Sequence, residues 1–142
     1  MLEGARKEVD DLHAFFASWY QGSIPKTAET FARAEQSLCE DFHMIGPEGI
    51  PLNRDEILGY IRDGHGGRKG QKYRIWIEAF QAEPLTDKLL LATYEEWVEA
   101  DNEIRGRASS AILRADANAP EGWVWLHLHE TWLPKNRARL TK

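Results

Sequence analysis

Trp123-Val-Trp-Leu-His-Leu-His-Glu-Thr-Trp132 is the stretch of sequence that decides the fold of this protein. Its run of aromatic and apolar residues predicts a strand, in which alternate side chains point to opposite faces of a sheet. One face would carry Trp123, Trp125, His127, His129 and Thr131, and the other Val124, Leu126, Leu128, Glu130 and Trp132. Neither face has the polar character of a surface open to water. We therefore expect helices, a cavity or a second subunit against both sides of this strand.

The bulk composition narrows the class of protein. The 142 residues are enough for one domain with a substantial core, and the formal net charge of -5 disfavours nucleic acid as a partner. Cys39 is the only cysteine, which excludes a disulfide within the chain and suits a reducing compartment. The sequence has neither an apolar run of membrane-spanning length nor a signal-peptide pattern. We expect a cytoplasmic protein with no membrane partner.

Helical patterns occupy the first part of the chain. The first helix has an apolar stripe at spacings of three and four residues, made by Val9, Leu12, Phe16 and Trp19. Thr27 is placed to cap a second helix, and Asn53 with Glu56 has the spacing of a capping box that opens a third. We assign His13 to the flank of the first helix rather than to a site.

The period of the pattern changes from that of a helix to that of a strand after residue 72. A short strand is expected at 41–46, and four long strands are expected at 73–83, 89–100, 104–115 and 123–133. The connections between the long strands are short, which predicts an antiparallel meander. Because the helices precede the sheet, the predicted class is α+β, with the helices packed on one face.

The order of helices, short strand, capped helix and four long strands occurs in one known family. The segments that carry the resemblance are Phe15, Phe16 and Trp19, residues 42–49, 94–97 and 105–110, and Trp123–Trp132. With them the chain resembles the nuclear transport factor 2-like superfamily, also called SnoaL-like or cystatin-like, and within it the bacterial branch of domains of unknown function. The resemblance covers residues 1–134 as a single domain and leaves a basic tail at 135–142. It implies a strongly curved antiparallel sheet wrapped around helices into a cone.

The resemblance also implies a pocket at the wide end of the cone and a homodimer formed through the convex side of the sheet. We expect the pocket to bind a small hydrophobic or carboxylated molecule, without a cofactor. If the domain is an enzyme, we expect a cofactor-free isomerase, cyclase or hydratase. His129 or His127 would be its acid–base group, and Glu96 the charge partner of that group. Arg107 would anchor an anionic group of the ligand, with Glu96 or Glu95 across from it in the sheet. The remaining ligand-binding candidates are Tyr94, His43 and Trp19.

Three alternatives stay open at this stage. His127 and His129 could bind a metal ion with Glu95 or Glu96, although we expect no metal site. Ketosteroid isomerase and the polyketide cyclases belong to the same superfamily, but their acid–base position is occupied here by Asp41 or His43 without a clear set of partner groups. The third alternative is a non-enzymatic dimerisation or assembly domain, like the association domain of calcium/calmodulin-dependent protein kinase II.

Overall fold

The computed structural model describes residues 2–135, which form three helices and six strands. The helices are α1 (Leu2–Gln21), α2 (Ala28–Ser37) and α3 (Arg54–Asp63). The strands are β1 (Leu38–Ile45), β2 (Pro51–Asn53), β3 (Arg74–Pro84), β4 (Leu89–Ala100), β5 (Glu103–Ala115) and β6 (Trp123–Trp132). The predicted α+β class is confirmed. The expected basic tail lies outside the described residues, except for residue 135.

The helix ends form where the capping pattern predicts them. The hydroxyl of Thr27 accepts a hydrogen bond from the amide of Thr30 at 3.2 Å, which caps α2. At α3, the Asn53 side chain accepts from the Glu56 amide and the Glu56 carboxylate accepts from the Asn53 amide, each at 2.9 Å. This reciprocal pair is the predicted capping box.

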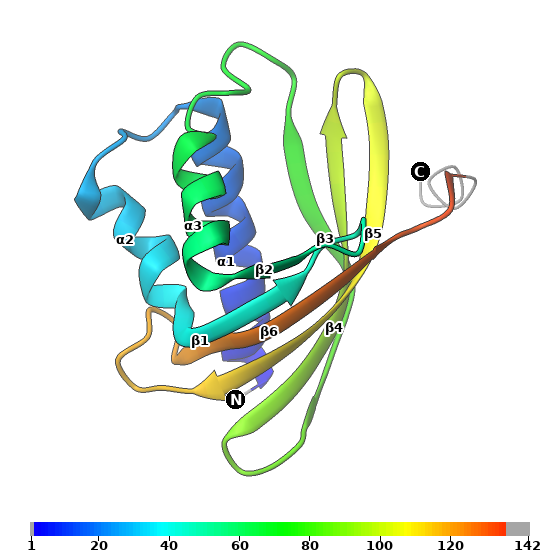
Figure 1. The fold of residues 1–142 in the computed structure, drawn as a ribbon. Coiled ribbons are helices and arrows are strands. Elements are labelled where there is room, and N and C mark those ends of the chain that lie inside the picture. The colour runs from blue at the N-terminus through cyan, green and yellow to red at the C-terminus, as the bar shows by residue number, and fades with distance from the viewer. Residues whose placement is uncertain (1, 136–142) are drawn as a thin grey trace.

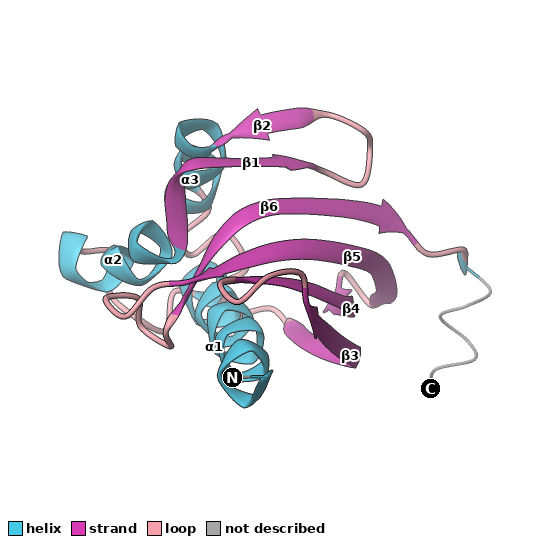
Figure 2. Cartoon of the chain, turned by 90° about the horizontal axis from the view of Figure 1, so that it is seen from below, coloured by secondary structure: helices cyan, strands magenta, loops and turns pink. Residues whose placement is uncertain are grey.

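All six strands form one sheet, in the order β2-β1-β6-β5-β4-β3. The four long strands make the predicted antiparallel meander, and β1 then pairs with β6 in parallel. The three helices lie on the same side of this sheet (Figure 1), and the sheet curves around them (Figure 2). We call the side toward the helices the concave face and the opposite side the convex face.

A β-bulge in β6 overturns the predicted division of this strand into two faces. Leu113 of β5 pairs with Trp125, but the preceding residue Ile112 pairs with His127, so Leu126 is an extra residue in β6. One extra residue reverses the side to which all later side chains point. Trp123 and Trp125 therefore share the concave face with Leu128 and Glu130. The expectation that His127 and His129 share the face of Trp125 was wrong.

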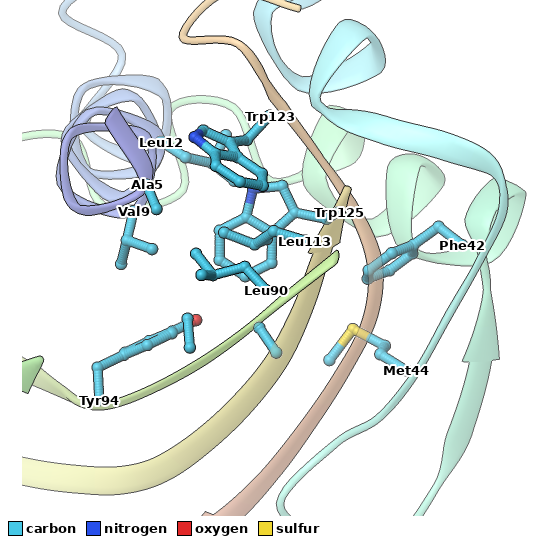
Figure 3. Packing of buried hydrophobic residues seen from close by; sticks show 12 residues of the cluster. Ala5, Val9, Leu12, Phe42, Met44, Leu90, Tyr94, Leu113, Trp123 and Trp125 are labelled. Atoms are coloured by element: carbon cyan, nitrogen blue, oxygen red, sulfur yellow. The ribbon is translucent and has the colours of Figure 1, made fainter. Parts of the chain in front are cut away.

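The core lies between α1 and the concave face. Figure 3 shows Ala5, Val9 and Leu12 of α1 against Leu90, Leu113 and Trp125 of the sheet. A second apolar cluster joins the other helices to the end of α1, and it consists of Trp19, Phe31, Ala34, Leu58 and Ile61. These two clusters hold the helices above the sheet and leave space between them. No helix within residues 2–135 is long and apolar enough to cross a membrane.

The convex face has a close contact of its own. The indole of Trp97 is fully buried there and covers Gly106 on the neighbouring strand. A Cβ atom added to Gly106 would lie 2.7 Å from three carbons of this ring. Trp76 stacks on Trp97 with 6.5 Å between ring centroids. Glycine at 106 therefore gives the tryptophan room to lie flat on the sheet.

Candidate functional site

A cavity of about 390 Å³ lies between the helices and the concave face. Its walls are mostly apolar, and the aromatic residues among them are Phe16, Tyr20, Phe42, Tyr60, Tyr73 and Trp125. The volume falls within the range of roughly 300 to 1,000 Å³ that is usual for small-molecule sites. The space that the two core clusters leave is thus large enough to hold an organic ligand.

Four ionisable side chains meet at one end of this cavity. Glu96 of β4 is central: one carboxylate oxygen lies 3.2 Å from Nε2 of His13 in α1, and the other accepts from Nη2 of Arg107 in β5 at 2.9 Å. Nη1 of Arg107 donates to Glu130 of β6 at 3.3 Å. His13, Glu96 and Glu130 are each no more than 5% exposed. We call these four residues the polar cluster.

The hydrogen bonds of His13 determine where its protons lie. Nδ1 is 2.7 Å from the carbonyl oxygen of Val9, and a carbonyl can only accept, so Nδ1 must be the donor. The neutral ring would then present a bare Nε2 to the carboxylate of Glu96. Burial on its own would lower the pKa of His13, but the charge and hydrogen bond of Glu96 outweigh it and raise that pKa. Both ring nitrogens of His13 thus face acceptors, an arrangement that favours the imidazolium form beside the ionised Glu96.

The two glutamates of the polar cluster differ in how many cations hold them. Burial favours the neutral form of both. At Glu96, however, Arg107 and His13 together outweigh burial and lower the pKa to about 2. At Glu130, burial and the negative charge of Glu96 outweigh Arg107 and raise the pKa to about 7. Near neutral pH Glu96 is thus the ionised member of the pair, and Glu130 is the one that exchanges a proton.

Two buried hydroxyl groups adjoin Glu130. Ser109 is the register partner of Glu130 on β5, and Tyr94 is the register partner of Ser109 on β4. Both hydroxyl groups are buried, and among residues 2–135 each has only the other as a nearby partner. Because a hydroxyl can donate one hydrogen bond and accept two, the pair retains hydrogen-bonding capacity beyond this contact.

A second buried ion pair, between Glu8 and Arg33, fixes one of the aromatic side chains that line the cavity. Glu8 of α1 is fully buried and accepts from Arg33 of α2 at 2.9 Å and from the indole nitrogen of Trp125 at 2.8 Å. Trp125 lines the cavity, and this bond fixes the orientation of its ring. Glu8 thus connects α1 to α2 and to β6, and both of its hydrogen-bond donors come from the protein.

The structure brings together only some of the residues predicted for a site. Glu96 and Arg107 line the cavity and pair with each other, and Glu96, not Glu95, is the register partner of Arg107. Tyr94 lies directly behind the polar cluster, with its ring 5.7 Å from that of His13. Trp19 belongs to the second apolar cluster, where its indole nitrogen donates to the carbonyl of Ile61 at 2.7 Å.

The remaining three candidates lie on the convex face, away from the cavity. His43 and His127 are register partners on β1 and β6, with 4.7 Å between their ring centroids. His129 follows at 6.5 Å from His127 and is exposed. Acid–base catalysis by His127 or His129 stays a prediction, and neither residue lines the cavity between the helices and the concave face. Within residues 2–135, no group of three or more His, Cys, Asp or Glu side chains is arranged to hold a metal ion.

Sequence reasoning missed His13 and Glu130. His13 follows Val9 by four residues and so falls on the apolar stripe of α1, which is a signal for an inward-facing polar group. Nothing near His13 in the chain identifies Glu96 as its partner, so the sequence predicts only a helix-flank residue. Strict alternation groups Glu130 with Val124, whereas the bulge at Leu126 puts it on the face of Trp125.

Comparison with solved structures identifies the fold. An NTF2-like protein of unknown function from Pseudomonas aeruginosa superposes with a TM-score of 0.81 at 24% identity, covering 92% of this chain and 99% of that one. The CaMKII hub from S. rosetta superposes with a TM-score of 0.70 at 14% identity, covering 92% and 95%. The predicted nuclear transport factor 2-like fold, and its likeness to bacterial proteins of unknown function, are confirmed.

Sequence comparison gives a narrower result. Sucrose-phosphatase 1 from Nicotiana tabacum is 23% identical over 128 residues, which are 89% of this chain and 30% of that protein. Probable sucrose-phosphatase 2 from Arabidopsis thaliana is 24% identical over 125 residues, 88% of this chain and 29% of that protein. The chain thus spans less than a third of the curated relatives it matches. Residues 5–134 match one family model, and the chain belongs to the family described as Sucrose-6-phosphate phosphohydrolase C-terminal.

Proposed function

We propose that this domain binds a small hydroxylated molecule of the sugar class in the cavity between the helices and the concave face. The observation that supports this most directly is the combination of aromatic walls with a buried polar cluster at one end. A sugar ring has apolar C–H faces, which suit aromatic side chains, and hydroxyl groups at its edge, which need donors and acceptors. The cavity offers both kinds of surface.

The relatives support the class of ligand. They are named for sucrose phosphatase activity, and this chain matches less than a third of their length. We therefore propose sugar binding as the function of this domain. Within the cavity Glu130 is the group suited to proton exchange with a bound molecule, because it lines the cavity and its pKa is raised to about 7 by burial.

Blocking the cavity tests the proposal. Leu128 lines it from β6, so Leu128→Trp should fill much of the space. We expect calorimetric titration with sucrose to show binding to the unmodified protein and none to Leu128→Trp. Leu85→Trp is the matched control, because Leu85 is 50% exposed and lies outside the cavity. Sucrose affinity that is the same in a folded Leu128→Trp protein and in the control would contradict binding in the cavity.

We also propose that two copies of the domain pair through the convex face. The observation that favours this is the row of small side chains there: Ala108, Ser110 and Thr131 are exposed on adjacent strands. Small residues make a flat surface on which a second sheet can lie closely. We expect sedimentation analysis to give twice the monomer mass and Ser110→Arg to give the monomer mass. A monomer for the unmodified protein at micromolar concentration would contradict pairing.

A further inference from the structure

We infer that the cavity selects neutral sugars against their phosphorylated forms. It would then suit the neutral sugar that a phosphatase releases and not the sugar phosphate on which a phosphatase acts. This inference rests on the proposed sugar-binding function. It follows from the way in which the polar cluster uses its two cations. The residues concerned are the four members of the cluster and Glu48, which also lines the cavity from the turn between β1 and β2.

Both cations beside the cavity are already committed to protein partners. His13 uses one ring nitrogen on the Val9 carbonyl and the other on Glu96. Arg107 directs Nη2 to Glu96 and Nη1 to Glu130. The Nε of Arg107 is buried and has no partner among the described residues. A phosphate group entering the cavity would have to displace Glu130 to gain a cation.

The sum of charges around the cavity also opposes an anion. Three carboxylates line it (Glu48, Glu96 and Glu130), against one guanidinium and one imidazolium, which leaves a net charge of -1 when all are ionised. Moving a phosphate dianion from water into such a site has a large desolvation cost, and the two cations that line the cavity, His13 and Arg107, are already paired with carboxylates. Neutral hydroxyl groups avoid this cost, and they can donate to the oxygens of Glu130.

Glu130 links this selectivity to pH. The charged groups that face it are Arg107 from β5, Glu96 from β4 and His13 from α1, and the phenols around the cavity are Tyr20, Tyr60 and Tyr73. A phosphorylated ligand near Glu130 would raise its tendency to hold a proton, because like charges disfavour ionisation. Binding of that ligand should therefore take up a proton and weaken as the pH rises, whereas binding of a neutral sugar should depend little on pH.

Paired titrations test the inference. Sucrose and sucrose 6-phosphate are titrated calorimetrically into the full chain at pH 6 and pH 8. We expect sucrose to bind at least tenfold more tightly than sucrose 6-phosphate at pH 8, with a smaller ratio at pH 6. Glu130→Gln keeps the shape of the side chain and removes its charge, so the ratio at pH 8 should fall by severalfold. Glu83→Gln, an exposed change outside the cavity, should leave the ratio as it is.

The possible outcomes separate this inference from the proposed function. Sucrose 6-phosphate that binds as tightly as sucrose, or more tightly, at pH 8 would overturn the selectivity and leave sugar binding intact. A ratio unchanged by Glu130→Gln would overturn the role of Glu130 as the residue that determines it. Absence of binding by both ligands would overturn the sugar-binding proposal itself, and the inference with it.

Discussion

His13 and Glu96 lie 83 positions apart in the chain and meet inside the domain, with 3.2 Å between Nε2 and Oε1. This contact joins α1 to the middle of the sheet. It also fixes the charge of the imidazole, because the other ring nitrogen donates to the carbonyl of Val9. The polar end of the cavity is therefore an ionic cluster and not a set of neutral hydrogen-bonding groups.

The first prediction concerns the protonation of His13. Since Glu96 raises the pKa of His13 while burial beside His43 lowers that of His127, the two histidines should lose their protons in a definite order. Nitrogen chemical shifts recorded through a pH titration should show that His13 keeps both ring nitrogens protonated to a higher pH than His127 does. If His13 releases its proton before His127, the assignment of an imidazolium to the polar cluster fails.

The second prediction concerns the pH dependence of stability through Glu130. Its pKa is raised to about 7 by burial, above the ordinary value of 4.5, so its contribution to folding is present below pH 4.5 and is lost as the pH rises through 7. Glu130→Gln does not titrate. Between pH 5 and pH 8, the unmodified protein should therefore lose roughly 2 to 3 kcal/mol of unfolding free energy relative to Glu130→Gln. Chemical unfolding at the two pH values measures this, and a relative gain over the same interval would contradict it.

The third prediction concerns Glu96, whose pKa is shifted in the opposite direction. Arg107 and His13 lower it to about 2 against the effect of burial, so the stability that Glu96 contributes is present above pH 4.5 and is lost as the pH falls toward 2. At pH 7, Glu96→Gln should reduce the free energy of unfolding by roughly 3 to 5 kcal/mol, because it leaves two buried cations without their shared anion.

The control for Glu96→Gln is Glu103→Gln, since Glu103 is exposed at the start of β5. This control should change the free energy of unfolding by less than about 0.5 kcal/mol. Equal effects of the two substitutions at pH 7 would mean that the cluster does not stabilise the fold. Denaturant titrations of both variants, run side by side, measure the difference.

The fourth prediction compares two glycines. A methyl group at Gly106 would lie 2.7 Å from the ring of Trp97, whereas a methyl group at Gly59 of α3 would meet nothing within 4 Å. Gly106→Ala should therefore lower the free energy of unfolding by roughly 1 to 3 kcal/mol through overpacking. Gly59→Ala should raise it by up to about 1 kcal/mol, because alanine favours a helix more than glycine does. Thermal unfolding of the two variants checks the opposite signs.

The parts of the fold that follow local rules could be predicted from the sequence. The capping box of Asn53 and Glu56 depends on residues three positions apart, and the long strands depend on a pattern of period two. The cone itself was predicted by resemblance to a known family. The pairing of Arg107 was narrowed to Glu95 or Glu96, and only the register of β4 against β5 decides for Glu96.

The candidate site was harder to predict because it depends on contacts between distant parts of the chain. The bulge at Leu126 arises where β6 meets β1 on one side and β5 on the other, and neither register can be read from β6 alone. His13 has no charged partner near it in the chain, since Glu96 reaches it only when β4 lies beneath α1. The polar cluster thus exists only in the assembled tertiary structure.

The extra residue at Leu126 breaks the alternation of side chains in β6, so the residues before it do not determine the faces of those after it. If Leu126 were kept but the strand ran straight, without the bulge, every later side chain would turn over, so that the imidazoles of His127 and His129 would enter the cone and Glu130 would leave it. Loss of the bulge would thereby exchange the contents of the interior for those of the outer surface without altering any side chain. One backbone irregularity therefore determines whether this domain encloses a carboxylic acid or a pair of imidazoles.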